Sequence, residues 1–527
     1  MMGIESDPSG VRFDAHRDQR QDTTARRRDL LVAIRDRAGF TPVLIRNINK
    51  LPLLSGRDIV NLELAKVYTS DFNSSFALNP SHIKGSELDV DLAQSIDNVI
   101  NFDRSQLAFG GPDEDEFYTL PPLINSTAFG PGEPLKVQEY TDSTAYAIPS
   151  SLALSRFLYT TKNFNGTIVP ASGYILWPYV AANLGTKAPV VVWAHGTSGF
   201  FRPQAPSAHR ALGYGYSAPF SLAQAGYAVV APDYAGLGID KSWDGTKILH
   251  QYHASPAGAR DVLYGMRAAR TLFPNELDSR FVVMGHSQGG GVAWAVAEAL
   301  AGHDENSEFG DLVSGYRGAI AASPTTDVFS GPPSFMLPTV GLNLDSIFPD
   351  FNLSYWLTDI GVKRTQLARE VKGSIGVIGQ LLQTRNDTYR TDYNSSWYAS
   401  AFSRLGDAGR KNIKGPLLVV QGTDDHVVPY NVTSKTVDDT WKKYPDCDLE
   451  FLVISGAGHV PSLDASKHVW LDWIRDRMHD QPLKKPGATT TVLKSLVPIG
   501  RYLSTINAIP LWAGLPQFSF QVVPLNI

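Results

Sequence analysis

The chain has 527 residues, of which 43% are hydrophobic and 10% aromatic, so it is a folded globular protein rather than a disordered one. A net charge of −5 without dense basic clusters argues against a nucleic-acid partner. No apolar stretch reaches the roughly 18–20 residues that a membrane span requires. This length predicts one large domain with additions, or two to three domains.

Two features of the chain point to different cellular locations. The N-terminus lacks the apolar core of a signal peptide, and the single Cys447 cannot form an internal disulfide, which favours the cytoplasm. Seven N-x-S/T acceptor patterns favour secretion instead, since composition alone predicts roughly three. They lie at Asn73, Asn125, Asn165, Asn352, Asn386, Asn394 and Asn431. Both locations stay open.

Residues 1–150 are polar at the start and rich in Pro and Gly further on, which predicts an irregular N-terminal extension. Beyond them the chain alternates apolar runs with helix-length segments, as in a mostly parallel sheet covered by helices on both faces. The expected strands are Tyr174–Tyr179, Pro189–Trp193, Tyr227–Ala231, Phe281–Met284, Gly318–Ala322, Leu417–Val420 and Phe451–Ile454. The fold class is therefore α/β, with ligands expected at the carboxyl ends of the strands.

The segment between the runs at Gly318–Ala322 and Leu417–Val420 is far longer than the dozen or so residues of an ordinary crossover. We expect an insertion here, at the edge of the sheet where a lid would be placed, which splits the α/β core into 151–328 and 411–480. Its apolar residues could form the core of a small domain or contact a substrate. The candidate substrate contacts are Phe335, Met336, Phe348 and Trp356.

The stretch FVVMGHSQGGGVAWAVAEAL, residues 281–300, places a serine between a short apolar run and a helix-forming segment. Its G-x-S-x-G pattern is typical of a nucleophile elbow, in which a strained strand-to-helix turn exposes the serine. The alternative is a Gly-rich turn whose serine only caps the helix. Ser287 is the candidate nucleophile.

A serine hydroxyl needs a histidine base and an acid that orients this base. In this kind of fold the chain order is Ser, then Asp or Glu, then His. Asp425 and His459 follow the last two expected strands in that order. Asp424 and Asp327 also lie just after strands, so the residues alone leave the acid open.

The oxyanion of an acyl-transfer intermediate requires preorganised N–H donors. The backbone N–H of Gln288, which follows the nucleophile, is one candidate. The backbone N–H of Thr197, in the loop after an earlier strand, is the other. We expect His195 to brace this loop and His286 to act in packing.

With these residues the chain resembles the α/β-hydrolase superfamily, and within it the secretory lipase (LIP) family. The similar stretches are VVVWAHGTSG, QAPS, GYAVVAPDYAGLG, GARDVLYGMRAAR, the elbow, AASPTTDV and GTDDHVVP. The resemblance implies that the acid is Asp425, which occupies the acidic position of the family's G-T-x-D-x-x-V-P pattern. It also implies an inserted lid or cap at 329–410 and a C-terminal tail or flap at 481–527.

These features predict a serine carboxylic ester hydrolase, an esterase or lipase that needs no cofactor or metal and cleaves a small hydrophobic ester. The fold also hosts acyltransferases, lyases and cyclases, which would use the same site on a natural-product ester. A serine peptidase and an inactive binding protein are further alternatives. The sequence leaves the oligomeric state open.

Overall fold

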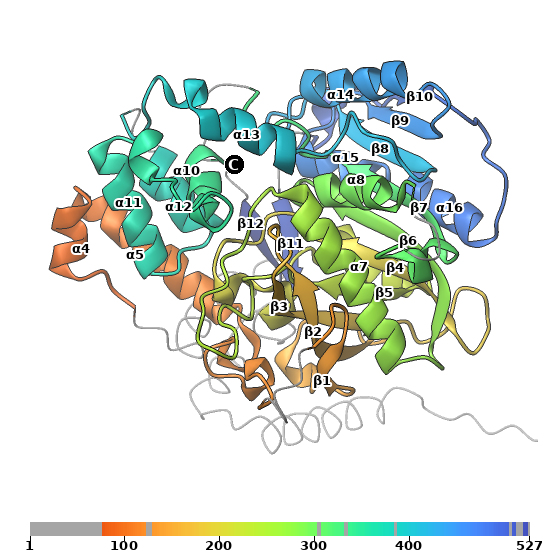
Figure 1. The fold of residues 1–527 in the computed structure, drawn as a ribbon, viewed down its shortest axis with the longest axis horizontal. Helices are drawn as coiled ribbons and strands as arrows, with labels where there is room; N and C mark the ends of the chain where they lie inside the picture. Colours follow the sequence, from red (N-terminus) through yellow and green to blue (C-terminus); the bar gives the residue numbers. More distant parts are fainter. Residues whose placement is uncertain are drawn as a thin grey trace, which may run out of the picture. The chain divides into compact units, whose positions relative to one another are not determined.

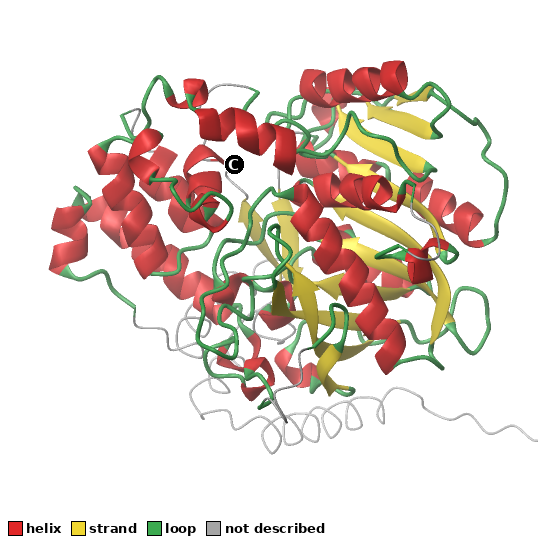
Figure 2. Ribbon diagram, viewed as in Figure 1, coloured by secondary structure: helices red, strands yellow, loops and turns green. Residues whose placement is uncertain are grey.

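The computed structural model describes residues 76–122, 129–302, 307–330, 336–383, 387–504, 508–512 and 520–524. A ten-stranded sheet runs through this part of the chain (Figures 1 and 2). Its strands are β1 (Pro134–Gln138), β2 (Ala153–Lys162), β3 (Ile168–Trp177), β4 (Ala188–Ala194), β5 (Ala228–Pro232), β6 (Leu277–His286), β7 (Tyr316–Ala322), β8 (Leu417–Gly422), β9 (Leu449–Ile454) and β10 (Thr489–Leu493).

The strands lie in the order β1–β2–β3–β5–β4–β6–β7–β8–β9–β10. The pairs from β1 to β5 are antiparallel, and every pair from β5 to β10 is parallel. The predicted α/β fold with a mostly parallel sheet is confirmed, and the seven expected strands correspond to β3–β9. A separate pair, β11 (Ala508–Trp512) and β12 (Phe520–Pro524), is antiparallel.

Helices cover both faces of the sheet. Side chains alternate between the two faces along each strand, so neighbouring residues of one strand enter different cores. In β4, Val190 and Val192 join a core with α7 (Ser255–Leu272), α8 (Gln288–Leu300) and α14 (Tyr430–Lys443). Val191 and Trp193 join the opposite core, with α6 (Pro219–Gln224), α15 (His459–Ala465) and α16 (Lys467–Met478). Burying each of these side chains contributes about 1.5–3 kcal/mol, so the centre of the sheet is firmly held.

The insert, residues 329–410, is helical and has a core of its own. Its helices are α10 (Met336–Gly341), α11 (Asp359–Glu370), α12 (Ile375–Gln383) and α13 (Trp397–Gly406). The same core takes in residues from α5 (Val90–Ser105), which lies beside α12 and follows the short α4 (Pro80–Gly85) (Figure 1). Part of the predicted N-terminal extension thus packs with the insert.

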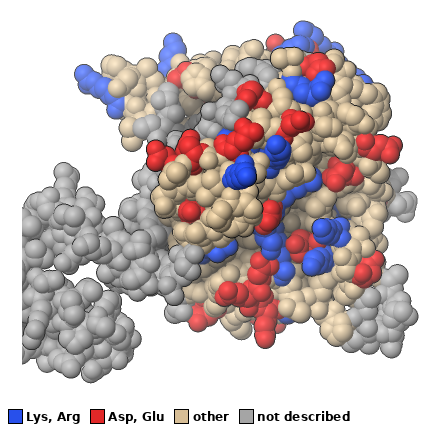
Figure 3. Space-filling view, turned by 90° about the vertical axis from the view of Figure 1, so that its left-hand side faces the viewer, with Lys and Arg blue, Asp and Glu red and all other residues tan. Residues whose placement is uncertain are grey.

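The remaining helices of the described ranges are short. They are α9 (Gly310–Val313) and the 3₁₀ turns η1 (Ala108–Gly110), η2 (Glu116–Tyr118), η3 (Ser143–Ala145), η4 (Arg202–Gln204), η5 (Pro206–Ala208), η6 (Gly215–Ser217), η7 (Leu344–Ser346), η8 (Leu353–Tyr355), η9 (Tyr393–Ser395) and η10 (Ile499–Arg501). On the face shown in Figure 3, basic and acidic side chains are interspersed. Within the described ranges, no helix is long and apolar enough to cross a membrane.

Candidate active site

Ser287 occupies the sharp turn between β6 and α8. Its backbone has φ 58° and ψ −120°, a conformation that non-glycine residues rarely adopt. The flanking glycines are required by close backbone approach, because a Cβ on Gly285 would lie 2.0 Å from the carbonyl oxygen of Gly289. A Cβ on Gly289 would lie 1.9 Å from the carbonyl oxygen of Ala194. The turn therefore has the strained geometry expected of a nucleophile elbow.

Asp425 and His459 lie at the carboxyl ends of β8 and β9 and meet through a buried contact. His459 Nδ1 is 2.8 Å from Asp425 Oδ2, and the two side chains are 2% and 0% exposed. Burial raises the pKa of Asp425, but the neighbouring His459 and the hydrogen bonds to the carboxylate outweigh this effect, so its pKa lies below the ordinary value. His459 Nε2 is buried and has no hydrogen-bond partner among the described residues.

The second oxygen of Asp425 is held by the backbone. Oδ1 accepts hydrogen bonds from the N–H groups of Val427 and Val428, both at 2.9 Å. Gln421 Nε2 donates to Oδ2 at 3.0 Å. These donors fix the carboxylate plane, so one oxygen faces the histidine.

The structure separates Asp425 from the other two candidate acids. Asp424 is part-exposed and lies 3.4 Å from His426 Nε2, outside the contact with His459. Asp327 follows β7, where its negative charge raises the pKa of Asp407. Of the three candidates, Asp425 is the one that contacts His459.

The two expected oxyanion donors lie at the ends of adjacent parallel strands, β4 and β6. Gln288 is the first residue of α8, where a backbone N–H has no partner within the helix. Thr197 follows β4, and a Cβ on the preceding Gly196 would come 1.8 Å from Tyr214 Oη. Among the described residues, neither N–H donates a hydrogen bond to the protein. Both groups could therefore donate to a ligand oxygen.

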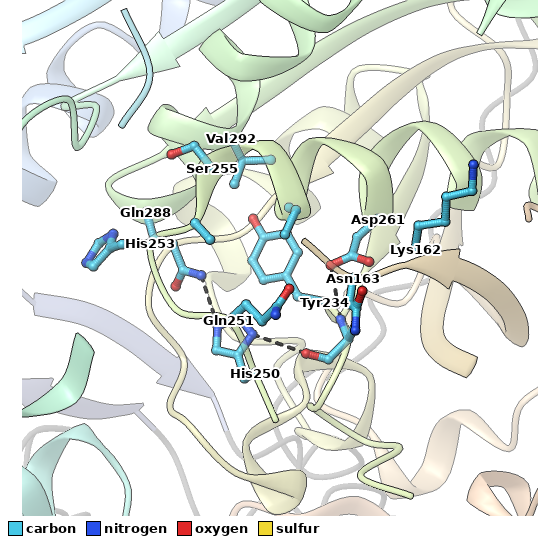
Figure 4. A pocket seen from close by; sticks show the side chains of 14 residues that line it. Lys162, Asn163, Tyr234, His250, Gln251, His253, Ser255, Asp261, Gln288 and Val292 are labelled. Carbon is cyan, nitrogen blue, oxygen red and sulfur yellow. Dashed lines mark hydrogen bonds between the residues drawn. The ribbon is translucent and has the colours of Figure 1, made fainter. Parts of the chain in front are cut away.

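The side chains of these two residues have partners that the sequence did not indicate. Thr197 Oγ1 is 2.8 Å from Tyr252 Oη, and Gln288 Nε2 is 3.0 Å from His250 Nε2 (Figure 4). The only sequence signal is a group of three polar aromatic residues in ILHQYHAS, residues 248–255, just before a helix. Nothing local to that stretch indicates what it contacts.

His286 and His195 both lie in hydrogen-bond networks. His286 Nε2 donates to the carbonyl oxygen of His459 at 3.1 Å, and its Nδ1 accepts from Tyr214 Oη at 2.9 Å. Burial, followed by the charge of His459, lowers the pKa of His286 to about 3, so the ring is neutral. His195 Nδ1 lies 2.7 Å from the carbonyl oxygen of Gly196. These contacts agree with the expected bracing and packing.

The four candidate substrate contacts in the insert have different surroundings. Phe335 lies outside the described residues, and Met336 begins α10 with a side chain that is not described. Phe348 is part-buried, with ring centroids 5.4 Å and 5.7 Å from those of Trp397 and Tyr398.

Trp356 is 0% exposed in the interior of the insert. Its ring contacts Phe329 at 5.4 Å and Phe351 at 4.8 Å. This geometry favours packing over substrate contact for Trp356.

A sharp elbow after the central strand β6, with an Asp–His pair in the loops after β8 and β9, is the arrangement of an α/β hydrolase. Residues 191–471 match the family model described as "Alpha/beta hydrolase family". The chain belongs to this family, which confirms the resemblance to α/β hydrolases. A comparison with curated protein sequences finds no match.

Solved structures with the same fold include lipases and esterases. Candida antarctica lipase A in its closed state has a TM-score of 0.56 and 17% identity, over 76% of this chain and 92% of that one. The rice cell wall degrading esterase LipA from Xanthomonas oryzae, in a ligand-bound form, has a TM-score of 0.50 and 18% identity, over 67% and 100%. A putative hydrolase from Legionella pneumophila has a TM-score of 0.53 and 18% identity, over 67% and 100%.

Proposed function

We propose that the protein is a serine carboxylic ester hydrolase that acts on a hydrophobic or acyl ester. The observation that carries the proposal is the strained Ser287 at the elbow together with the buried 2.8 Å contact between Asp425 and His459. A hydroxyl nucleophile needs a histidine base and an acid that orients this base, and in this proposal His459 and Asp425 supply them. The lipases and esterases among the structural neighbours add support for this reaction class.

In the proposed mechanism, Ser287 Oγ attacks the acyl carbon while His459 Nε2 takes the hydroxyl proton. Asp425 accepts from Nδ1–H, which keeps the proton on Nδ1 and leaves the Nε2 lone pair free. The N–H groups of Gln288 and Thr197 stabilise the oxyanion. The imidazolium then protonates the leaving alcohol, and a water molecule, deprotonated by the same base, attacks the acyl-enzyme to release the acid.

The insert at 329–410 is proposed as a lid that forms part of the acyl site. Ser287 is 8% exposed and His459 is 2% exposed, so both residues are largely covered. The insert leaves the core after the carboxyl end of β7, at the sheet edge where ligands bind in such folds, and the chain then returns to the amino end of β8. Phe348 is the described candidate for an acyl contact because its side chain is only part-buried.

A series of p-nitrophenyl esters from acetate to palmitate tests the reaction and its chain-length preference together. We expect Ser287→Ala to lower kcat by roughly 10⁴–10⁶-fold with an unchanged melting temperature, because triad members act as a unit. Hydrolysis by Ser287→Ala at near the wild-type rate would show that the nucleophile lies elsewhere. Product analysis with added alcohol distinguishes hydrolysis from acyl transfer.

A further inference from the structure

One short loop contacts both residues whose N–H groups are the proposed oxyanion donors. This bracing loop, residues 249–254, lies between β5 and α7, and its His250 and Tyr252 are 4% and 2% exposed. His250 contacts the side chain of Gln288, and Tyr252 contacts the side chain of Thr197. Two residues that are far apart in the sequence therefore share one support.

The contact between His250 and Gln288 has a defined donor and acceptor. His250 Nδ1 is 3.3 Å from the carbonyl oxygen of Ala235, which can only accept, so the ring proton is on Nδ1. Nε2 therefore carries the lone pair and accepts from Gln288 Nε2 at 3.0 Å (Figure 4). Burial, and then the charge of His195, lowers the pKa of His250 to about 3, so the imidazole ring is neutral and Nε2 carries no proton.

The surroundings leave these side chains little freedom. The cavity that His250 and Gln288 line has a volume of only about 10 Å³, close to the space of one water molecule. The ring of Tyr252 packs edge-on against Phe200, with centroids 4.8 Å apart. The contact between Gln288 and His250 therefore lies in closely packed, buried surroundings.

The bracing loop is also held from the insert. Asn343 Nδ2 donates to the carbonyl oxygen of His250 at 2.7 Å. Gln251 Nε2 lies 3.3 Å from Ser346 Oγ, in η7. The loop is thus fixed on one side by the insert while its other side supports the oxyanion donors.

We propose that His250 and Tyr252 are positioning residues, which hold the backbone N–H groups of Gln288 and Thr197 in the direction of the reacting oxygen. This inference rests on the proposed ester hydrolysis and adds two residues to it. Neither side chain touches the reacting atoms, so the expected defect is in the turnover step rather than in substrate binding.

The first experiment compares His250→Leu with His250→Gln in p-nitrophenyl ester hydrolysis. Leucine removes the acceptor, whereas the glutamine amide oxygen can take the place of the Nε2 lone pair. Because loss of an oxyanion donor costs about 10²–10³ in kcat, we expect misalignment by His250→Leu to cost roughly ten- to fifty-fold, with KM changed less than about two-fold. His250→Gln should recover most of the lost kcat.

A double-mutant cycle separates positioning from general destabilisation. Gln288→Met breaks the same contact from the other side, so the double variant should lose no more kcat than His250→Leu alone. The pair Tyr252→Phe and Thr197→Val should behave in the same way, and it tests the idea independently if His250→Leu does not fold. Additive losses in both cycles would refute the proposal.

His253→Asn is a control for packing within the same loop, because the ring of His253 lies against that of Tyr252, with centroids 3.9 Å apart, but makes no contact with Gln288 or Thr197 that would aim their N–H groups. Its ring nitrogens are buried and have no hydrogen-bond partner among the described residues, and asparagine tolerates its φ of 59°. We expect its kcat to stay within about two-fold of wild type. An equal loss of kcat in His253→Asn and His250→Leu would show that the loop has only a structural role and would overturn the proposal.

Ser287→Ala in the same assay keeps the two proposals distinguishable. Retained hydrolysis by Ser287→Ala would contradict the ester-hydrolase function itself. An inactive Ser287→Ala alongside a His250→Leu variant with wild-type kcat would contradict the positioning role alone.

Discussion

Replacing Asp425 with asparagine should disable the base while leaving the fold intact, and the hydrogen bonds around this residue explain why. The N–H groups of Val427 and Val428 both donate to Oδ1, so the asparagine oxygen would occupy this position. Its NH₂ group would then face His459 Nδ1, in the place of an oxygen that is now 2.8 Å away. Two donors cannot share this contact, so the proton of His459 would move to Nε2.

A histidine with its proton on Nε2 cannot accept the proton of Ser287. The expected loss in kcat is therefore about 10⁴-fold, the magnitude of a wrong-tautomer defect, and KM should change little. Asp424→Asn is the matched control, since its carboxylate faces His426 rather than His459. The assay is p-nitrophenyl ester hydrolysis at neutral pH, with melting temperatures for both variants. A small loss in Asp425→Asn, or an equal loss in Asp424→Asn, would refute this reasoning.

Three further predictions concern other parts of the protein. Gly196→Ala would place a Cβ 1.8 Å from Tyr214 Oη, and relief of this clash should displace the backbone N–H of the next residue, Thr197. We expect kcat to fall by about 10²-fold or more. Unchanged kinetics would show that Thr197 is not an oxyanion donor. Burial, and then the charge of Asp327, raises the pKa of Asp407 to about 7. Between about pH 4 and 7 the folded protein therefore binds more protons at this carboxyl than the unfolded chain does. As a consequence, Asp407 makes the free energy of unfolding fall as the pH rises through that window. Urea unfolding at pH 4.5 and 7.5 should show a smaller decrease for Asp407→Asn, and equal decreases would assign the effect to other groups. Burial of each methylene at about 0.8 kcal/mol should raise kcat/KM about four-fold, and Phe348→Ala should flatten this rise with acyl length. Trp356→Ala should instead lower the melting temperature and affect short and long esters alike. The same pattern in both variants would show that Phe348 is not part of the acyl site.

Six of the seven strands that the sequence predicts, β4–β9, lie in the parallel part and are largely buried, and the seventh, β3, is a buried strand with antiparallel neighbours. In β4 and β6 the apolar run is continuous, and such a run is typical of a covered parallel strand. β2 was missed because it carries Arg156, which is 1% exposed and pairs with Asp115 at 2.6 Å. A buried charge with a distant partner cannot be recognised from a local pattern. The edge strands β1 and β10 are partly exposed and lack a continuous apolar run.

In the candidate site too, residues set by a local sequence pattern could be predicted, whereas contacts between distant segments could not. The elbow is a local pattern, because the strained turn at Ser287 requires small residues at Gly285 and Gly289, where a Cβ on Gly285 would meet the carbonyl oxygen of Gly289. The acid could not be chosen from the residues alone, since Asp424 and Asp425 are adjacent and only the loop conformation decides which one faces His459. The contacts of His250 and Tyr252 depend on how three separate loops meet, so the sequence carried no signal for them.

The packing of the insert also constrains how a lid could move. Arg364 on α11 is 2% exposed and donates to the carbonyl oxygens of Ser86, Glu87 and Leu381. Separating a buried guanidinium from these acceptors would cost several kcal/mol, because the charge would lose its hydrogen bonds without gaining water. Residues 76–105 should therefore move together with the insert. The boundary of the moving part would then lie at Phe200 and Tyr252, where the core of the insert meets the hydrolase core. Because Tyr252 also contacts Thr197, opening at this boundary would disturb the proposed oxyanion site, and a closed lid would restore it.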